Sequence, residues 1–368
     1  MGVTYVPPHV LRLETEVDGA PEAELTVAPK TAHDAAAVLR LASERRLNVQ
    51  VWGGGTRSGF GDPPAPDIVM SMERLSGVEA WAPDDLTLTT AAGAGVADVE
   101  SMLAERNQTA VLPEAAGAST VGGVVAAGAS SLRRGRLLAT RERILETTVV
   151  TGDGRIVRSG GRVVKNVTGY DLSRLHAGAF GALGVVVSVC LKLWPTPPAA
   201  ATVEVEAAEA ASVIARPLAV IQERSGTRVF VWGTAAEVVS KVSRLGGVAR
   251  EGHDWPADPS GDFRWSLRLP PALTGEGVGR LPSDWEYAAI HGAGEIRAAS
   301  GSLDGAQDLR SWAEAVGGRL VAADAPAGGL GGFDPWGAPP PALGVQRDLI
   351  AQFDPARVIN PGRLPGGL

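Results

Sequence analysis

Short apolar runs and helical patterns alternate through the first part of the chain. Thr31 is a favourable helix N-cap residue, and the apolar positions Ala36, Leu39 and Ala42 repeat behind it at helical spacing. This pattern predicts a helix over residues 32–46. Apolar runs bounded by turn-forming residues predict strands, because such runs fit a buried sheet. The predicted strands are residues 48–52, 67–71, 78–81, 86–91 and 109–112, and a second predicted helix covers residues 96–106.

The next apolar runs predict a hairpin and one long strand. The sequence Gly-Asp-Gly at residues 152–154 separates the runs 146–151 and 156–158, which is typical of a β-hairpin with a tight turn. Residues 185–194 form the most apolar stretch of the chain. This stretch is too short to cross a bilayer and contains Lys192, so we expect no transmembrane segment.

The pattern changes beyond a proline-rich stretch that ends at residue 198. Strand-like runs alternate here with alanine-rich helical segments. The predicted strands are residues 201–205 and 229–232, and the predicted helices are residues 235–245, 309–316 and 343–353. We therefore expect a first domain over residues 1–198, a smaller α/β domain over residues 199–335 and a C-terminal tail over residues 336–368.

Composition narrows the classes of function. The 368 residues are 45% hydrophobic and 20% charged with a formal net charge of −7, so the chain lacks the basic balance that nucleic-acid phosphates require. Cys190 is the single cysteine, which excludes a disulfide and a cysteine-ligated metal cluster within the chain. Residues 1–13 lack the basic and then apolar layout of a signal peptide. We expect a cytoplasmic protein, with any membrane association made through partners.

The first of four glycine-rich segments follows directly after a predicted strand. It reads Gly53-Gly54-Gly55-Thr56-Arg57-Ser58. Glycines let the backbone approach a ligand closely and turn several N–H groups inward, which suits a pyrophosphate; the alternative is a tight loop without a ligand. The third glycine of a dinucleotide-binding fingerprint is replaced by serine at position 58, and no P-loop lysine follows. The common nicotinamide and ATP interpretations are therefore disfavoured.

The second segment, Pro113 to Gly128, consists almost entirely of small residues. Side chains of this size cannot build a core by themselves, so the pattern indicates a large ligand lying against the backbone. The alternative is a closely packed helix that begins after Thr120.

The third and fourth segments also leave structural alternatives open. The third, residues 160–172, is a short polar turn in which Asp171 is at least as well suited to cap a helix beginning near Leu172 as to bind a ligand. The fourth, residues 178–184, spaces three glycines along one side of a turn. That spacing suits contact with a cofactor and equally suits packing of a helix on a sheet.

Together the segments resemble the FAD-binding domain of the vanillyl-alcohol-oxidase type, the PCMH-type fold, over about residues 20–196 and the tail. The run from Gly161 to Leu175 (GRVVKNVTGYDLSRL) is similar to that of the FAD-binding E subunits of bacterial glycolate oxidases. The tail sequences Phe-Asp-Pro at residues 353–355 and Asn-Pro-Gly-Arg at residues 360–363 resemble the closing motif of that family. The resemblance implies an α+β fold: a two-lobed FAD-binding domain, a smaller α/β cap domain and a tail that returns to the flavin.

The resemblance also implies roles for residues. The first segment would hold the pyrophosphate of FAD, Gly117 to Gly123 would run beside the phosphates and the flavin, and Asn360 would reach the isoalloxazine ring. Relatives with covalent flavin carry a histidine where this chain has Thr56, and the second segment offers no cysteine, so non-covalent FAD is expected. The expected cofactor-binding residues are Gly53, Gly54, Gly55, Thr56, Arg57, Ser58, Pro113, Gly117, Ser119, Thr120, Gly122, Gly123, Lys165, Asn166, Tyr170, Gly181, Gly184, Val185 and Asn360, with Gly181, Gly184 and Val185 near the adenosine half.

A substrate site is harder to identify. Catalytic members of the wider family resemble one another in a histidine-rich, metal-binding site in the second domain. This chain has five histidines and none of them pair at metal-ligand spacing on a helix, so no metal site is expected. His291 is the one candidate for a catalytic base, and a structural role is the more common one for a lone histidine.

Three functions follow from these residues. The one we favour is an FAD-binding subunit of a glycolate-oxidase-type oxidoreductase that converts a small 2-hydroxy acid to a 2-oxo acid, with a catalytic FAD subunit and an iron–sulfur subunit as partners. The second is a stand-alone FAD-linked dehydrogenase of another hydroxy acid or alcohol. The third is a structural subunit that has lost its flavin, which the intact glycine segments argue against.

Overall fold

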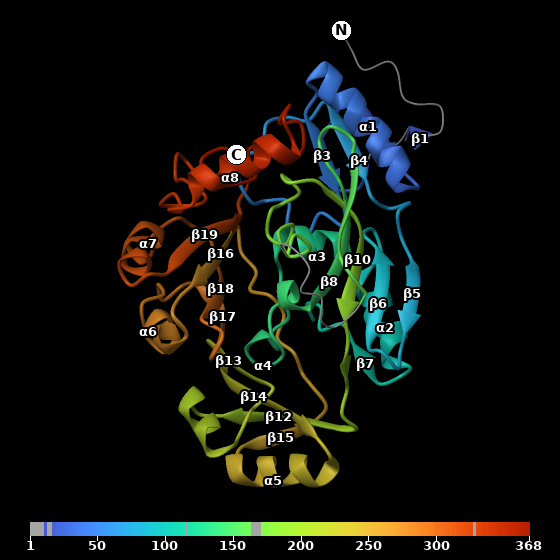
Figure 1. Ribbon diagram of the computed structural model, residues 1–368. Coiled ribbons are helices and arrows are strands. Elements are labelled where there is room, and N and C mark those ends of the chain that lie inside the picture. The colour runs from blue at the N-terminus through green and yellow to red at the C-terminus, as the bar shows by residue number, and fades with distance from the viewer. Residues whose placement is uncertain (1–10, 13–16, 115–116, 163–170, 327–328) are drawn as a thin grey trace. The chain divides into compact units, whose positions relative to one another are not determined.

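The computed structural model describes residues 11–12, 17–114, 117–162, 171–326 and 329–368 (Figure 1). The chain forms two compact units. The first comprises Met1–Ser130, Thr140–Pro195 and Pro339–Leu368, and the second comprises Ser131–Ala139 and Thr196–Ala338. Residues 131–139 thus group with the second unit, where Arg134 forms an ion pair with Glu295. The domain limits at residues 198 and 335 remain predictions.

The first lobe of unit 1 is a small, largely parallel sheet with one helix. The helix α1 (Ala32–Arg45) confirms its prediction and begins with a capping box, in which the Thr31 hydroxyl accepts the Asp34 N–H at 3.1 Å and the Asp34 carboxylate accepts the Thr31 N–H at 3.0 Å. The strands run parallel except for the antiparallel β1. In spatial order they are β1 (Leu11–Arg12), β2 (Leu25–Ala28), β4 (Ile68–Ser71) and β3 (Val49–Trp52).

The second lobe of unit 1 is an antiparallel five-stranded sheet. Its central strand β10 is almost wholly buried, and α1 packs against β8 and β9, so one hydrophobic core joins both lobes. The predicted hairpin at residues 152–154 is confirmed, with Gly154 at φ +77° in the turn. The strands in order are β5 (Val78–Ala82), β6 (Thr87–Ala91), β10 (Val185–Lys192), β8 (Ile144–Val150) and β9 (Ile156–Gly160). The remaining elements are α2 (Val96–Ala104), α3 (Val121–Ala127), η1 (Thr140–Arg143), α8 (Leu343–Phe353) and the paired β7 (Gln108–Thr109) and β11 (Trp194–Pro195).

Two sequence predictions in unit 1 are wrong. The strand expected over residues 109–112 ends at Thr109, because the Thr109 hydroxyl accepts the Val111 N–H at 2.9 Å and the Glu100 carboxylate accepts the Leu112 N–H at 2.9 Å. These side chains take the N–H groups that a strand ladder would need. No helix begins near residue 172 in the described part of this segment, where the Asp171 carboxylate instead accepts the Ser173 hydroxyl at 2.6 Å within a turn.

Unit 2 is built on one antiparallel sheet of eight strands. Helices α6 and α7 pack at one end of the sheet, over a core that contains the stacked Trp265 and Trp285, and α5 packs over β12 and β14 at the other end. The strands in order are β15 (Val248–Glu251), β12 (Ala199–Val205), β14 (Gly226–Gly233), β13 (Ala219–Glu223), β17 (Glu286–Ile290), β18 (Glu295–Ser300), β16 (Phe263–Arg268) and β19 (Arg319–Asp324). The helices are α4 (Arg134–Leu137), η2 (Ala208–Val213), α5 (Ala235–Leu245), η3 (Pro271–Leu273), α6 (Thr274–Gly279) and α7 (Ala306–Ala315).

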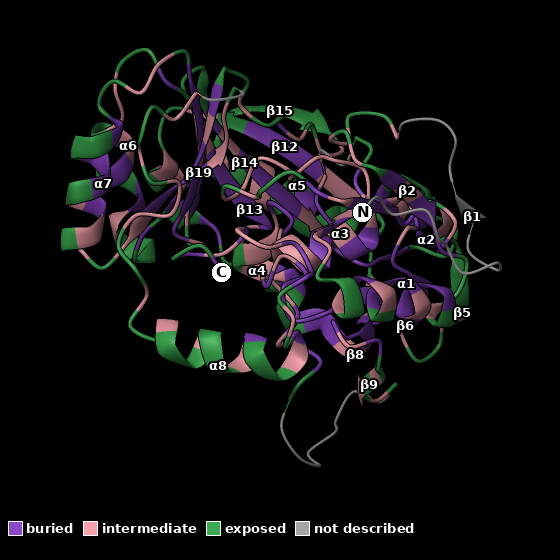
Figure 2. Ribbon diagram, turned by 90° about the horizontal axis from the view of Figure 1, so that it is seen from above, coloured by how far each residue is buried: buried purple, intermediate pink, exposed green. Residues whose placement is uncertain are grey.

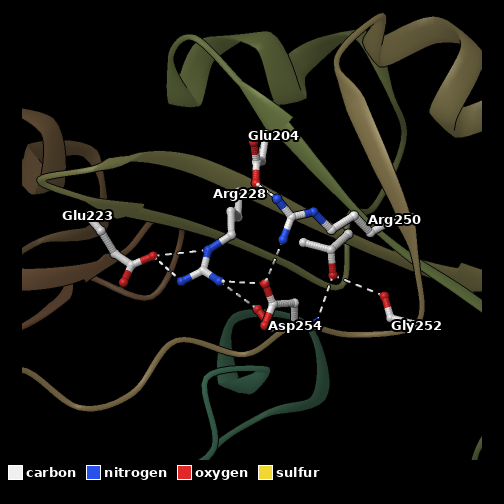
Figure 3. Close-up of polar contacts among 7 residues, drawn as sticks. Glu204, Glu223, Arg228, Arg250, Gly252 and Asp254 are labelled. Carbon is white, nitrogen blue, oxygen red and sulfur yellow. Dashed lines mark hydrogen bonds and ion pairs between the residues drawn. The ribbon is translucent and has the colours of Figure 1, made fainter.

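Charged side chains link the strands at the β15 edge of this sheet. Arg228 on β14 pairs with Glu223 and with Asp254, and Arg250 on β15 pairs with Glu204 at 3.0 Å (Figure 3). The edge strand β15 is exposed along its length (Figure 2). Paired charges on an exposed edge discourage pairing with another chain. In the described ranges we find no helix with the length and apolar character needed to span a bilayer.

His176 gives the stability of unit 1 a pH dependence. Its ring is 2% exposed, packs edge-on against Phe353 at 5.7 Å, and its Nδ1 has no hydrogen-bond partner. Burial lowers the pKa of His176 from 6.5 to about 4, so the unfolded chain binds a proton in this range that the folded chain does not.

We therefore expect the free energy of unfolding to fall as the pH drops from about 6.5 towards about 4, by up to about 3 kcal/mol. Denaturant titrations across this range measure the fall. The His176→Phe variant should lose this component, whereas a His33→Phe control, at an exposed position of α1, should retain it. Coincident pH profiles for wild type and His176→Phe would contradict the assignment.

Candidate cofactor site

Unit 1 contains a cavity of about 810 Å³, including space open to solvent. Four segments far apart in the chain form most of its walls. They are the end of β3 with the loop that follows it (residues 50–58), the N-terminal cap and body of α3 (residues 120–127), the turn before β10 with the start of that strand (residues 180–186), and the tail residues Asn360 and Arg363.

Most of the expected cofactor-binding residues meet at this cavity. Those that line it are Gly53, Gly54, Gly55, Thr56, Arg57, Ser58, Thr120, Gly122, Gly123, Gly181, Val185 and Asn360. The Ser119 hydroxyl adjoins it, at 3.0 Å from both the Thr56 hydroxyl and the Arg57 guanidinium. Pro113, Gly117 and Gly184 are not among the lining residues, and Lys165, Asn166 and Tyr170 lie outside the described part of the chain. Their roles towards the cofactor stay predictions.

The loop after β3 presents backbone donors to the cavity. Gly55 adopts φ +68°, and the Ser58 N–H and hydroxyl both donate to the Gly55 carbonyl, at 3.2 and 2.8 Å. Among the described residues, the N–H groups of positions 53–56 bond to no backbone acceptor. Consecutive free N–H groups in such a turn form a concave anion-binding surface. The loop thus fits a diphosphate.

Close contacts within the protein leave no room for a side chain at several of the glycines here. A Cβ on Gly54 would lie 1.5 Å from the Ala118 carbonyl oxygen, and one on Gly122 would lie 2.5 Å from the Ala92 Cβ. The alternative of a closely packed helix after Thr120 is confirmed, since α3 follows and the Thr120 hydroxyl accepts the Gly123 N–H at 3.2 Å. The small residues allow close approach of chain segments, and this approach creates the cavity.

Asn360 fixes three of the four walls. Its side-chain oxygen accepts the Val51 N–H at 2.8 Å, and its side-chain N–H donates to the Phe180 carbonyl at 2.8 Å. Its backbone N–H donates to the Val49 carbonyl at 2.9 Å, which extends the edge of β3 by one bridge. Asparagine suits the position because it tolerates the left-handed conformation found here, φ +45°. Contact of Asn360 with the isoalloxazine ring stays a prediction.

Sequence reasoning missed several lining residues. Met72, Ala92 and Val186 give the cavity an apolar wall, and Phe180 lines it beside its ring contact with Phe60 at 5.0 Å. Nothing in the local pattern marks these positions, because they come from strands and turns that are apolar for packing. Arg363 also lines the cavity, and its place in the tail motif was the available signal.

The candidate base His291 lies in unit 2, on the turn after β17. Its Nε2 lies 2.9 Å from the side-chain oxygen of Gln222, and its backbone N–H donates to the Val220 carbonyl at 3.0 Å. Burial lowers the pKa of His291, which keeps the ring neutral at neutral pH. These contacts give the residue a structural function, and its catalytic role stays a prediction.

Comparisons with known proteins agree with this geometry. The FAD binding domain family matches residues 23–160. The chain is 30% identical over 335 residues to the glycolate oxidase subunit GlcE of Escherichia coli K12, which covers 84% of this chain and 91% of that protein. It is 32% identical to a D-lactate dehydrogenase of Archaeoglobus fulgidus over 48% of this chain and 40% of that protein. A solved alkyldihydroxyacetonephosphate synthase shares the fold, with a TM-score of 0.64 and 13% identity over 93% of this chain and 76% of that one.

These matches define a protein that uses FAD. The chain belongs to the PCMH-type FAD-binding family, which includes the glycolate oxidase subunit GlcE. The α+β fold expected from the sequence is confirmed. The cavity fits this cofactor, since it combines free backbone N–H groups, two guanidinium groups and an apolar wall.

Removal of the Asn360 amide should loosen the site. Asn360→Ala removes the acceptor of the Val51 N–H and a donor to the Phe180 carbonyl, and each lost hydrogen bond costs roughly 0.5–1.5 kcal/mol of unfolding free energy. Asn360→Asp keeps the acceptor for the Val51 N–H and should therefore lose less unfolding free energy. Denaturant unfolding of the FAD-free protein measures the unfolding free energy of both variants. Equal stability of wild type and Asn360→Ala would show that the two bonds do not hold the tail.

A methyl group at position 54 should deform the cavity. Gly54→Ala places its Cβ against the Ala118 carbonyl and must push the two loops apart, so we expect FAD affinity to fall at least tenfold. The control is Gly275→Ala on α6, where an added Cβ meets nothing within 4 Å. Flavin fluorescence titration of both variants provides the measurement. Unchanged FAD affinity in Gly54→Ala would show that the loop after β3 does not bind the cofactor.

Proposed function

We propose that this chain is the FAD-binding subunit of a glycolate-oxidase-type complex that oxidises a small 2-hydroxy acid to the 2-oxo acid. The observation that carries the proposal is the match to a glycolate oxidase subunit over 91% of that protein's length. The match to the D-lactate dehydrogenase covers less than half of this chain. In such a complex FAD would supply a two-electron acceptor for the oxidation, and the residues of this chain would hold one FAD of the complex.

In this proposal the residues of unit 1 bind and position the cofactor. The free N–H groups of the loop after β3 hold the diphosphate, with Thr56 and Ser119 as further donors. Val185 and Gly181 lie beside the adenosine half, and Asn360 reaches the isoalloxazine ring. FAD binds non-covalently, since the described lining residues include no cysteine, histidine or tyrosine to link it.

The partners we propose are a catalytic FAD subunit and an iron–sulfur subunit. Support for the first is a 28% match, over 50% of this chain, to the glycolate oxidase subunit GlcD of Bacillus subtilis. Support for the second is the single cysteine, because a cluster held by several cysteines needs another chain. We place the complex in the cytoplasm, with contact to a membrane made by the partners.

A stand-alone dehydrogenase is the second candidate. The observation that favours it is the similarity of the FAD domain to enzymes named D-lactate and D-2-hydroxyglutarate dehydrogenase, at 32% and 35% identity. It requires a complete substrate site within the chain. Reduction of the isolated protein's own flavin by a hydroxy acid distinguishes the two candidates.

The visible spectrum of the isolated chain, followed by anaerobic addition of glycolate, provides the first test. We expect a flavin spectrum whose colour is released by acid and is not bleached by glycolate. The purified complex should oxidise glycolate at least tenfold more slowly without this chain. Full activity without the chain contradicts the proposal, and bleaching of the isolated chain by glycolate or another hydroxy acid supports the second candidate.

A further inference from the structure

The tail brings one buried cation to the cavity. Arg363 is 6% exposed and lines the cavity, and its guanidinium donates to the carbonyls of Ser58 and Phe60. Two backbone contacts hold the tail in place: the Asp62 N–H donates to the Gly362 carbonyl at 3.0 Å, and the backbones at Gly61 and Gly362 approach so closely that neither position has room for a Cβ. The guanidinium is therefore fixed beside the loop with the free N–H groups.

The charge of Arg363 has no acidic partner among the described residues. No carboxylate lies within ion-pair distance of it, and both of its hydrogen-bond partners are neutral carbonyls. Burial lowers the pKa of Arg363 to about 10, which leaves the side chain charged at neutral pH. A buried charge is costly unless an opposite charge offsets it.

Two arginines of unit 2 offer a comparison, because acidic side chains lie near both. Arg297 in unit 2 pairs with Glu295 at 3.1 Å and with Asp258 at 2.7 Å. Arg310 resembles Arg363 in being 4% exposed and in donating to two backbone carbonyls, those of Leu320 and Asp334. Unlike Arg363, it experiences the negative charges of Asp334 and Glu314. Arg363 differs from both in that it lines the cavity.

We propose that Arg363 supplies the positive charge that pairs with the diphosphate of FAD. The inference rests on the binding of FAD in this cavity, which the proposed function shares, and adds a tail residue to the phosphate site at residues 53–58. The diphosphate is the part of FAD with fixed negative charge, and the guanidinium is bonded to the loop whose N–H groups are free for an anion. A guanidinium binds phosphate oxygens through paired N–H donors.

The experiment uses the full chain after removal of FAD by acid. The test variants are Arg363→Gln, whose amide can still donate to the two carbonyls, and Arg363→Lys, which keeps the charge. The matched control is Arg310→Gln. Three ligands are compared: FAD, riboflavin, which has no phosphate, and inorganic pyrophosphate. The readouts are the flavin Kd by fluorescence and the rise in Tm caused by pyrophosphate.

We expect Arg363→Gln to weaken FAD binding at least tenfold, to leave riboflavin affinity within twofold of wild type, and to abolish the rise in Tm with pyrophosphate. Arg363→Lys should keep part of both effects, and Arg310→Gln should keep all of them. Wild-type affinity for FAD in a folded Arg363→Gln overturns the proposal, as does equal loss of riboflavin binding, which would assign a structural role.

Two further results need their own interpretation. If Arg363→Gln does not fold, the wild-type protein provides the test. Pyrophosphate must then raise its Tm, and added salt must weaken FAD binding more than riboflavin binding. Absence of both effects overturns the proposal. An Arg363-dependent FAD site in a complex that does not oxidise 2-hydroxy acids would defeat the proposed function alone.

Discussion

The cofactor site depends on the two hydrogen bonds made by the side-chain amide of Asn360. One bond fixes the end of β3 through the Val51 N–H, and the other fixes the turn before β10 through the Phe180 carbonyl. Because both segments line the cavity together with the tail, a single side chain sets the distances between three of its walls. The same contact requires glycine at position 181, because a Cβ there would lie 2.5 Å from the Asn360 amide nitrogen.

Local patterns predicted those elements whose ends and faces are decided by neighbouring residues. The helices α1, α5 and α8 begin and end within one residue of their predicted limits, and capping by Thr31 and Thr234 explains two of them. The strand at residues 109–112 could not be predicted correctly, because the Glu100 side chain on α2 takes the Leu112 N–H. A contact between a helix and a later loop leaves no mark in the local spacing of apolar residues.

The position of the site was predictable, but the reason for its composition was not. Runs of glycine marked the loop after β3 and the segment around α3, and both line the cavity. The small size of these residues is also required by contact between chain segments, as at Gly54 and Ala118. The tail motif marked Arg363, but its contact with the loop after β3, and that of Phe180 with Asn360, are long-range and could not be read from local spacing.

The bond between Val51 and Asn360 joins positions 309 residues apart, which fixes when the site can exist. Ribosomes synthesise a chain from its N-terminus, so the loop after β3 leaves the ribosome well before the tail that completes the cavity. The cavity closes only after residue 360 has left the exit tunnel, so the loop cannot complete the cofactor site by itself.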